Sequence, residues 1–333
     1  VINANTSITT TGTVDAVAGL TMVSNGTIQT IGTIEGATVN LESTGADLNL
    51  DNTVNATSGG VVLTAATNVD AATAVTGATA VTITAGGNVV LAGVTTATAG
   101  VLTITSDSDD SGAGDVTATA TLSGNDVVIS GQNVSTDNIT ADAGDVTINA
   151  DAAVNLTNVG TGLTQATGNM TINGGTTVTV DQLLAGGDMT INAATGAFTA
   201  NNTAAAIDLA ATGALSIAAA GQVNIDGVSS GATVNIVSTG ADLDIEGTVT
   251  STAGAVTLVA STGIDTAALV TGANNVTMTA GSSVNVVTIT ATAGDVTIDA
   301  GTTFANSGLV QAADDIVINA NTSITTTGTV DAV

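Results

Sequence analysis

The sequence predicts an all-β fold, a parallel β-helix (β-solenoid) with about 20 residues per coil and about 16 coils. Three observations support this prediction. One strand-like phrase returns along the chain at nearly constant spacing, residues suited to turns separate its copies, and small, β-forming side chains dominate the 333 residues. Threonine alone fills 66 positions and glycine 40, and 44% of the residues are hydrophobic. This composition favours a folded chain over a disordered one.

The recurring phrase has the form apolar, Thr or Asn, apolar, polar, small, as in VTINA at Val146. Apolar and polar residues alternate within it, which indicates a strand with one face turned inward. Valine, isoleucine and threonine also suit a pleated surface. From Val256 onward the phrase returns every 20 residues. Copies begin at Val39, Val81, Leu102, Val146, Met170, Met189, Val234, Val256, Val276, Val296 and Ile316.

The segments between the phrases contain Gly, Asn, Asp and Ser, which tolerate turn geometry. No helical periodicity persists. A hairpin meander is the alternative arrangement, but it does not explain why the same phrase returns at each coil length. A stack of parallel coils does explain it, because like residues then lie over like residues along the axis. At about 4.8 Å per stacked strand, about 16 coils would span about 76 Å.

A longer repeat is superimposed on this one. Residues Val1–Val17 recur identically as Val317–Val333. We therefore predict a single continuous β-solenoid over residues 1–333, in which 1–316 is one period and 317–333 begins the next. The parent polypeptide would be a tandem array. The expected partners are neighbouring repeats of the same polypeptide or identical subunits, stacked head-to-tail, with lateral bundling also open.

The residue types that are absent exclude several function classes. The chain has 28 acidic residues, no Lys, Arg, His, Cys, Pro, Trp or Tyr, and a net charge of −28. Disulfides, thiolate metal sites, histidine-dependent nucleophiles and Schiff-base lysines are excluded. Nucleic-acid binding and membrane insertion are not expected, because the chain has no basic residue for phosphates and no long apolar run. Only carboxylates remain for catalysis, and the only aromatic residues are Phe198 and Phe304. We expect no enzyme activity.

One acidic segment interrupts the regular spacing of the recurring phrase. Asp107, Asp109, Ser111 and Gly112 satisfy the spacing D-x-D-x-S-G, by which a tight loop turns several oxygens toward one hard cation. Asp115 could supply a further ligand. We therefore name Asp107, Asp109, Ser111 and Asp115 as a candidate Ca²⁺ site, although the twelfth loop position lacks the usual glutamate. A solvated acidic turn is the alternative. No other cofactor is expected, but the unneutralised carboxylates should attract Ca²⁺ or other divalent cations diffusely.

Threonine pairs spaced T-x-T raise a minor alternative, an ice-binding solenoid whose flat threonine columns order water. Other copies of the phrase carry Thr-x-Asn, so the column would be irregular, and threonine is in any case suited to outward strand positions. The pairs are Thr82/Thr84, Thr103/Thr105, Thr277/Thr279 and Thr288/Thr290.

Three longer phrases carry a family resemblance: AGDVTINADAAVNL at 143–156, GGDMTINAATGAF at 186–198 and AGGNVVLAG at 85–93. They resemble the β-helical shafts of filamentous-haemagglutinin-like bacterial surface proteins and related giant repetitive adhesins. The resemblance implies a right-handed parallel β-helix that is exported to the cell surface and projects from it as a fibre.

The expected function is therefore structural. The segment would be a repeat unit of a long extracellular fibre, appendage or surface layer at the cell surface, and its stacked coils would give a stiff, protease-resistant shaft. The main alternative is an adhesin, in which such a shaft displays a binding surface or carries a tip domain.

Overall fold

A computed structural model describes residues 1–109, 112–157, 163–201 and 207–333. These residues form strands and turns and contain no helix, and hence no helical segment that could cross a membrane. The strands of successive coils pair in parallel, as in the stacking of β10 (Val61–Ala65) on β13 (Val81–Ala85). The predicted all-β solenoid of about 16 coils is confirmed, and the hairpin meander is excluded.

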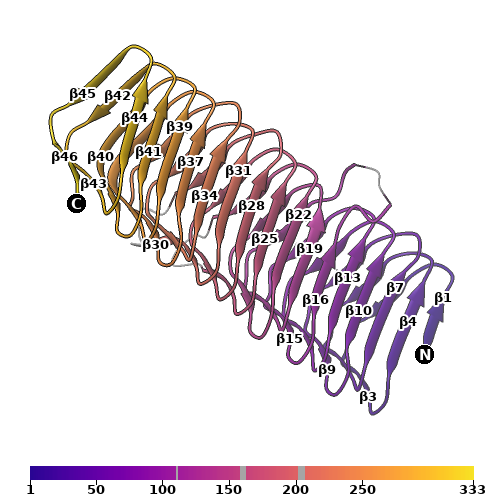
Figure 1. Cartoon of the computed structure of the whole chain (residues 1–333). Coiled ribbons are helices and arrows are strands. Elements are labelled where there is room, and N and C mark those ends of the chain that lie inside the picture. Colours follow the sequence, from indigo (N-terminus) through magenta and orange to yellow (C-terminus); the bar gives the residue numbers. More distant parts are fainter. Residues whose placement is uncertain (110–111, 158–162, 202–206) are drawn as a thin grey trace. The chain divides into compact units, whose positions relative to one another are not determined.

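The chain divides into two compact units, Val1–Gly168 and Asn169–Val333. That residues 1–333 form one continuous solenoid stays a prediction, and each unit is described by itself. In each unit a coil begins with a first strand, and the first strands of successive coils pair into one parallel sheet (Figure 1).

In Val1–Gly168 most coils have a first strand of five residues followed by two of three residues. The first strands are β1 (Ile2–Ala4), β4 (Leu20–Ser24), β7 (Val39–Ser43), β10, β13, β16 (Leu102–Thr105), β19 (Val127–Gly131) and β22 (Val146–Ala150). The second strands are β2 (Ile8–Thr10), β5 (Ile28–Thr30), β8 (Leu48–Leu50), β11 (Val69–Ala71), β14 (Val89–Leu91), β17 (Val116–Ala118), β20 (Val134–Thr136) and β23 (Val154–Leu156). The third strands are β3 (Val14–Ala16), β6 (Ile34–Gly36), β9 (Val54–Ala56), β12 (Val75–Gly77), β15 (Thr95–Ala97), β18 (Leu122–Gly124), β21 (Ile139–Ala141) and β24 (Thr164–Ala166).

Asn169–Val333 repeats this plan, except that two long strands, β38 (Ile264–Gly272) and β40 (Val284–Ala291), replace separate second and third strands. The first strands are β25 (Met170–Gly174), β28 (Met189–Ala193), β31 (Leu215–Ala219), β34 (Val234–Ser238), β37 (Val256–Ala260), β39 (Val276–Ala280), β41 (Val296–Ala300) and β44 (Ile316–Ala320). The second strands are β26 (Val178–Val180), β29 (Phe198–Ala200), β32 (Val223–Ile225), β35 (Leu243–Ile245), β42 (Thr303–Asn306) and β45 (Ser323–Thr326). The third strands are β27 (Leu183–Ala185), β30 (Ile207–Ala211), β33 (Val228–Gly231), β36 (Val249–Ser251), β43 (Leu309–Ala312) and β46 (Thr329–Ala332).

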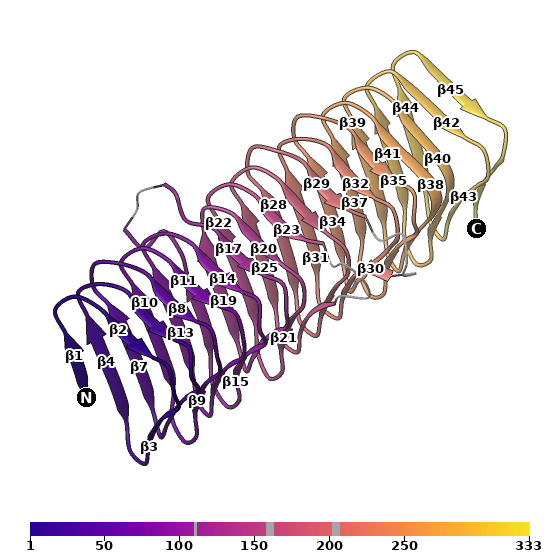
Figure 2. The same cartoon turned by 180° about the vertical axis from the view of Figure 1, so that it is seen from behind.

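The recurring phrase of the sequence is the first strand of the coil. All eleven predicted starting residues begin first strands, from Val39 of β7 to Ile316 of β44. The second and third strands, seen from behind in Figure 2, were not predicted. Three-residue strands such as VDA in β11 are too short to show an alternation of their own, so the sequence pattern marks only one strand per coil.

Register places like residues over like, as predicted. Val61 pairs with Val81, Ile172 with Ile191, and Asn173 with Asn192. Alternate side chains of most strands are buried, so the core is a column of Val, Ile, Leu and Ala side chains inside the coils. Both aromatic residues, Phe198 and Phe304, are fully buried in this core. Burial of many small apolar groups, together with the backbone hydrogen bonds between coils, therefore stabilises the coils.

Some coil corners approach too closely for any side chain. A Cβ atom added to Gly32 would lie 2.1 Å from the carbonyl oxygen of Gly12 in the preceding coil. A Cβ atom added to Gly12 itself would have no atom within 4 Å. Glycine is thus required at this corner by the neighbouring coil and not by the local backbone.

Candidate functional site

The acidic segment that interrupts the regular spacing of the phrase begins at Asp107, just after β16. Asp107 has a left-handed backbone (φ 55°), and its carboxylate oxygens accept the backbone N–H of Gly112 at 3.1 and 3.0 Å. Aspartate tolerates this conformation better than most residues. Ser111 lies outside the described residues. The Asp107 carboxylate therefore stabilises the turn itself.

The other two predicted ligands have different surroundings. Asp109 lines an open hollow together with Glu42 and Thr64 of neighbouring coils. Asp115 accepts the Asn133 side-chain N–H at 2.8 Å and its backbone N–H at 3.2 Å through Oδ1. Within the described ranges, no group of three or more acidic side chains is placed to hold a metal ion. The Ca²⁺ site at Asp107, Asp109, Ser111 and Asp115 stays a prediction.

Asp115 belongs to a feature that sequence reasoning missed, a ladder of Asp and Asn side chains immediately before the second strands. In this Asx ladder, the side-chain oxygen of each member accepts the backbone N–H of the equivalent residue one coil further on. The signal was present as an Asp or Asn directly before the first apolar residue of a strand. The bonds run from Asn68 N–H to Asp47 (3.1 Å), from Asn88 to Asn68 (2.9 Å), from Asp115 to Asn88 (2.9 Å), from Asn133 to Asp115 (3.2 Å) and from Ala153 to Asn133 (3.1 Å).

Asp47 and Asp242 occupy this same ladder position in the two units. A hydrogen bond from the Thr67 hydroxyl holds the pKa of Asp47 below its usual value against the opposing effect of burial, and Asn68 adds to it. The Thr262 hydroxyl lowers the pKa of Asp242 in the same way, with a further bond from the Gly263 backbone N–H at 2.8 Å. Both carboxylates are thus stabilised in their charged form by donors of the next coil.

A second Asx ladder precedes the first strands. The Asp295 N–H donates to Asn275 at 3.0 Å, and the Asp315 N–H donates to Asp295 at 3.0 Å. The same bond joins Asp188 to Asn169 at 2.9 Å. Many of the acids therefore have a structural role, because they satisfy backbone donors at the turns.

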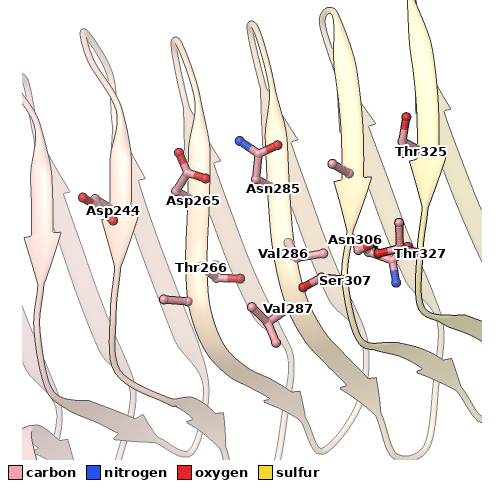
Figure 3. Close-up of a pocket in the computed structure, with 12 residues that line it drawn as sticks. Asp244, Asp265, Thr266, Asn285, Val286, Val287, Asn306, Ser307, Thr325 and Thr327 are labelled. Carbon is pink, nitrogen blue, oxygen red and sulfur yellow. Dashed lines mark hydrogen bonds between the residues drawn. The ribbon is translucent and has the colours of Figure 1, made fainter.

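Outward-facing acids form a different arrangement in Asn169–Val333. Asp244 of β35 lies in register with Asp265 of β38, which lies in register with Asn285 of β40. Figure 3 shows these three side chains on successive coils beside an open hollow of about 360 Å³. Burial raises the pKa of Asp244, and the negative charges of Asp265, Asp226 and Asp242 raise it further. Stacked like charges therefore repel here, as the composition led us to expect.

Asp208 of β30 is unusual because its side chain is fully buried. Its Oδ2 accepts the Gly227 backbone N–H at 2.7 Å, whereas Oδ1 has no hydrogen-bond partner among the residues that the structure describes. Burial raises its pKa to about 6; the Gly227 bond opposes this shift, and the charges of Asp226 and Asp181 add to it. Strand alternation in Ile-Asp-Leu predicts an outward Asp208, so the sequence contains no signal for this burial.

Threonine pairs come together only locally. Thr82 and Thr84 of β13 lie in register with Thr103 and Thr105 of β16. The next positions along the Thr82–Thr103 column are valines on both sides. Among the described strands, these two are the only neighbours that stack one T-x-T pair directly on another.

Compared with models of known protein families, with curated proteins and with solved structures, the chain matches none of them.

Proposed function

We propose that this chain is a structural repeat unit of a long extracellular fibre, appendage or surface layer at the cell surface. The observation that carries the proposal is the parallel stacking of like residues from coil to coil, as in Val61 on Val81 and Ile172 on Ile191. Each coil is bonded to its neighbours by backbone ladders and apolar contacts along the axis. Such a stack is stiff, and few of its peptide bonds fit the extended site of a protease.

The side-chain inventory supports a passive role. Backbone N–H groups at the turns donate to several of the acids, such as Asp115 and Asp295. General acid–base chemistry has only carboxylates available, because the chain has no His, Cys, Lys or Arg. The fold therefore supplies a scaffold, and the proposal assigns it no catalytic step.

Divalent cations are proposed as the only cofactor, bound diffusely along the acidic surface. The chain has no basic residue that could neutralise its 28 carboxylates. The stacked pair Asp244 and Asp265 illustrates the cost, since the charge of Asp265 raises the free energy of the charged form of Asp244. A cation near the pair relieves this repulsion.

Imaging tests the proposal. Negative-stain electron microscopy of the native assembly should show unbranched fibres or a sheet of such fibres, and antibodies should label intact cells. Globular particles, or label that reaches the protein only after the cells are permeabilised, would contradict the shaft. Specific binding of isolated fibres on a glycan array would instead favour the adhesin alternative.

A further inference from the structure

The outward side of the first strands in Asn169–Val333 carries almost no charge. Seven of these strands, β25, β28, β31, β34, β37, β39 and β41, pair in unbroken order, with β34 in the middle (Figure 1). Among the described first strands of this unit, Asp299 is the only acidic residue. The other acids of the unit lie in turns or on later strands of the coil, as Asp244 and Asp265 do. We call the outward side of these seven strands the neutral face.

Two rows of side chains form the neutral face, because alternate residues of each strand are buried and the others point outward. Register continues each row from strand to strand. The Asn235 row consists of Thr171, Thr190, Ser216, Asn235, Thr257, Thr277 and Thr297. The Val237 row consists of Asn173, Asn192, Ala218, Val237, Val259, Thr279 and Asp299.

Each row matches itself when its order is reversed about β34. In the Asn235 row, every hydroxyl then lies opposite a hydroxyl, and Asn235 lies opposite Asn235. In the Val237 row, apolar groups meet apolar groups, and each amide meets a hydroxyl or a carboxylate that can accept its N–H. The opposed residues are Val237 and Val237, Ala218 and Val259, Asn192 and Thr279, and Asn173 and Asp299. A two-fold interface requires such a surface, because the same patch serves both partners.

We propose that the neutral face binds the neutral face of a second copy of this chain, about a two-fold axis that runs along β34. Ala218, Val237 and Val259 then form an apolar centre, and the hydroxyl and amide side chains around them form a polar rim, as in other protein interfaces. A two-fold axis along the stacking direction would instead set the Val237 row on the Asn235 row. That arrangement would bury the valines against amides and hydroxyls, which disfavours it.

Charge favours this face for contact between two copies. Each copy carries a net charge of −28, so a stable contact has to keep the carboxylates of the two copies apart. Asp299 lies three strands from the axis, and the reversal sets it opposite Asn173 of the second copy instead of opposite another acid. Its Oδ1 also accepts the Asn319 side-chain N–H at 2.7 Å within its own chain. The neutral face therefore allows contact without opposing carboxylates.

The neutral face is large enough for a weak, specific dimer. Seven strands about 4.8 Å apart, each of five residues that rise about 3.3 Å, cover about 34 by 16 Å. Each copy then contributes about 550 Å², and the total of about 1,100 Å² just exceeds the roughly 1,000 Å² that a specific interface needs. We therefore expect dissociation in the micromolar range.

Sedimentation of the full chain measures this dimer at about 0.15 M NaCl, which screens charges more than about 8 Å apart. We expect dimers to form as the chain concentration rises to about 100 µM. Val237→Asp opposes two carboxylates at the axis and should raise the dissociation constant at least about tenfold. Val287→Asp adds the same charge at a 37% exposed position of β40, outside the neutral face, and is the matched control. A chain that stays monomeric, or an equal effect of the two variants, would overturn the proposal.

Cross-linking tests the direction of the axis. Asn192→Cys and Thr279→Cys are made in separate chains, and the cysteine-free background makes each introduced thiol unambiguous. A bismaleimide that spans the distance of about 10 Å between packed sheets should join the two variants when they are mixed. Neither variant alone should form cross-linked pairs, because four strands of about 4.8 Å separate its two cysteines along the stack. Pairs formed by each variant alone, and not by the mixture, would refute the axis along β34.

This inference goes beyond the proposed function, and the two can fail separately. A chain that stays monomeric at about 100 µM but comes from a fibrous native assembly would retain the shaft and refute the pairing. A dimer that Val237→Asp abolishes, in a protein whose native assembly is globular, would retain the pairing and refute the shaft.

Discussion

At the scale of single residues, a recurring role of acids and amides in this chain is to accept backbone N–H groups of the next coil. An Asx ladder needs only a side chain of the right length that ends in an acceptor oxygen. Asp and Asn therefore both serve within it, as in Asn88, Asp115 and Asn133. Turn donors that are left without a partner cost free energy, which the ladder avoids. The composition of the turns thus follows from the stacking.

Asn88 allows this role to be measured. Asn88→Ala removes the acceptor of the Asp115 N–H and should lower the free energy of unfolding by about 1 kcal/mol. Asn88→Asp keeps the oxygen and should cost less. Asn55→Ala, at an outward strand position with no ladder bond, is the control. Chemical denaturation measures all three, and an equal effect of Asn88→Ala and Asn55→Ala would refute the ladder's contribution.

Asp208 should make stability depend on pH. Its pKa is about 6 in the folded chain against an ordinary value of 3.8, so the folded state holds its proton more tightly. The associated stabilisation is complete below pH 3.8 and is lost as the pH rises through 6. Asp208→Asn, which carries no charge, should therefore exceed the natural chain in stability at about pH 7, by up to about 2 kcal/mol, and should lose this advantage at about pH 4.

Thermal melts at the two pH values measure this difference. Asp70→Asn, at an exposed position of β11, is the control and should show no such pH-dependent gain. If Asp208→Asn and Asp70→Asn behave alike across this range, the buried carboxyl is not responsible.

At the scale of the element, the first strand of each coil could be predicted and the other strands could not. A five-residue strand such as VTINA in β22 carries two full alternations, which are local and therefore visible in the sequence. A three-residue strand such as IEG in β6 acquires its conformation from pairing with the coils on either side. Its strand character is a tertiary effect that no short window contains.

Corner glycines give a prediction at this scale. Gly32→Ala would place its methyl carbon 2.1 Å from the Gly12 carbonyl oxygen, so one coil must move away from the other. We expect a loss of about 1–3 kcal/mol in the free energy of unfolding. Gly263→Ala, whose added Cβ would lie 3.2 Å from its nearest neighbour, a side-chain oxygen of Asp242, is the control and should cost less. Equal destabilisation by the two variants would show that a local backbone preference, and not coil contact, requires glycine.

At the scale of the whole molecule, charge is the dominant property. The net charge is −28 and the chain has no basic side chain, so the carboxylates repel one another without any internal neutralisation. Register partly relieves this, because acids often lie over amides or hydroxyls, as Asp265 lies over Asn285. Direct stacks such as Asp244 on Asp265 remain. Stability should therefore depend on ionic conditions more than on any single contact.

Melting curves test this dependence. Added NaCl should raise the melting temperature, and Ca²⁺ at equal ionic strength should raise it further, with chelator reversing the Ca²⁺ effect. Asp265→Asn should reduce the Ca²⁺ shift more than Asp70→Asn does, since Asp70 pairs with Asn49 and Val90 and not with another acid. A melting temperature indifferent to both salts would remove the cation proposal.

The sequence by itself determined the strand phrase, its parallel return at about 20 residues and the exclusion of histidine, thiol and lysine chemistry, because alternation and composition are local properties. The tertiary structure alone decided the contacts between coils. It placed Asp115 as an acceptor in an Asx ladder, buried the side chain of Asp208, and brought Gly32 close to the backbone of Gly12. Those contacts join residues a coil apart, and coil lengths vary. Only the completed register brings such residues together.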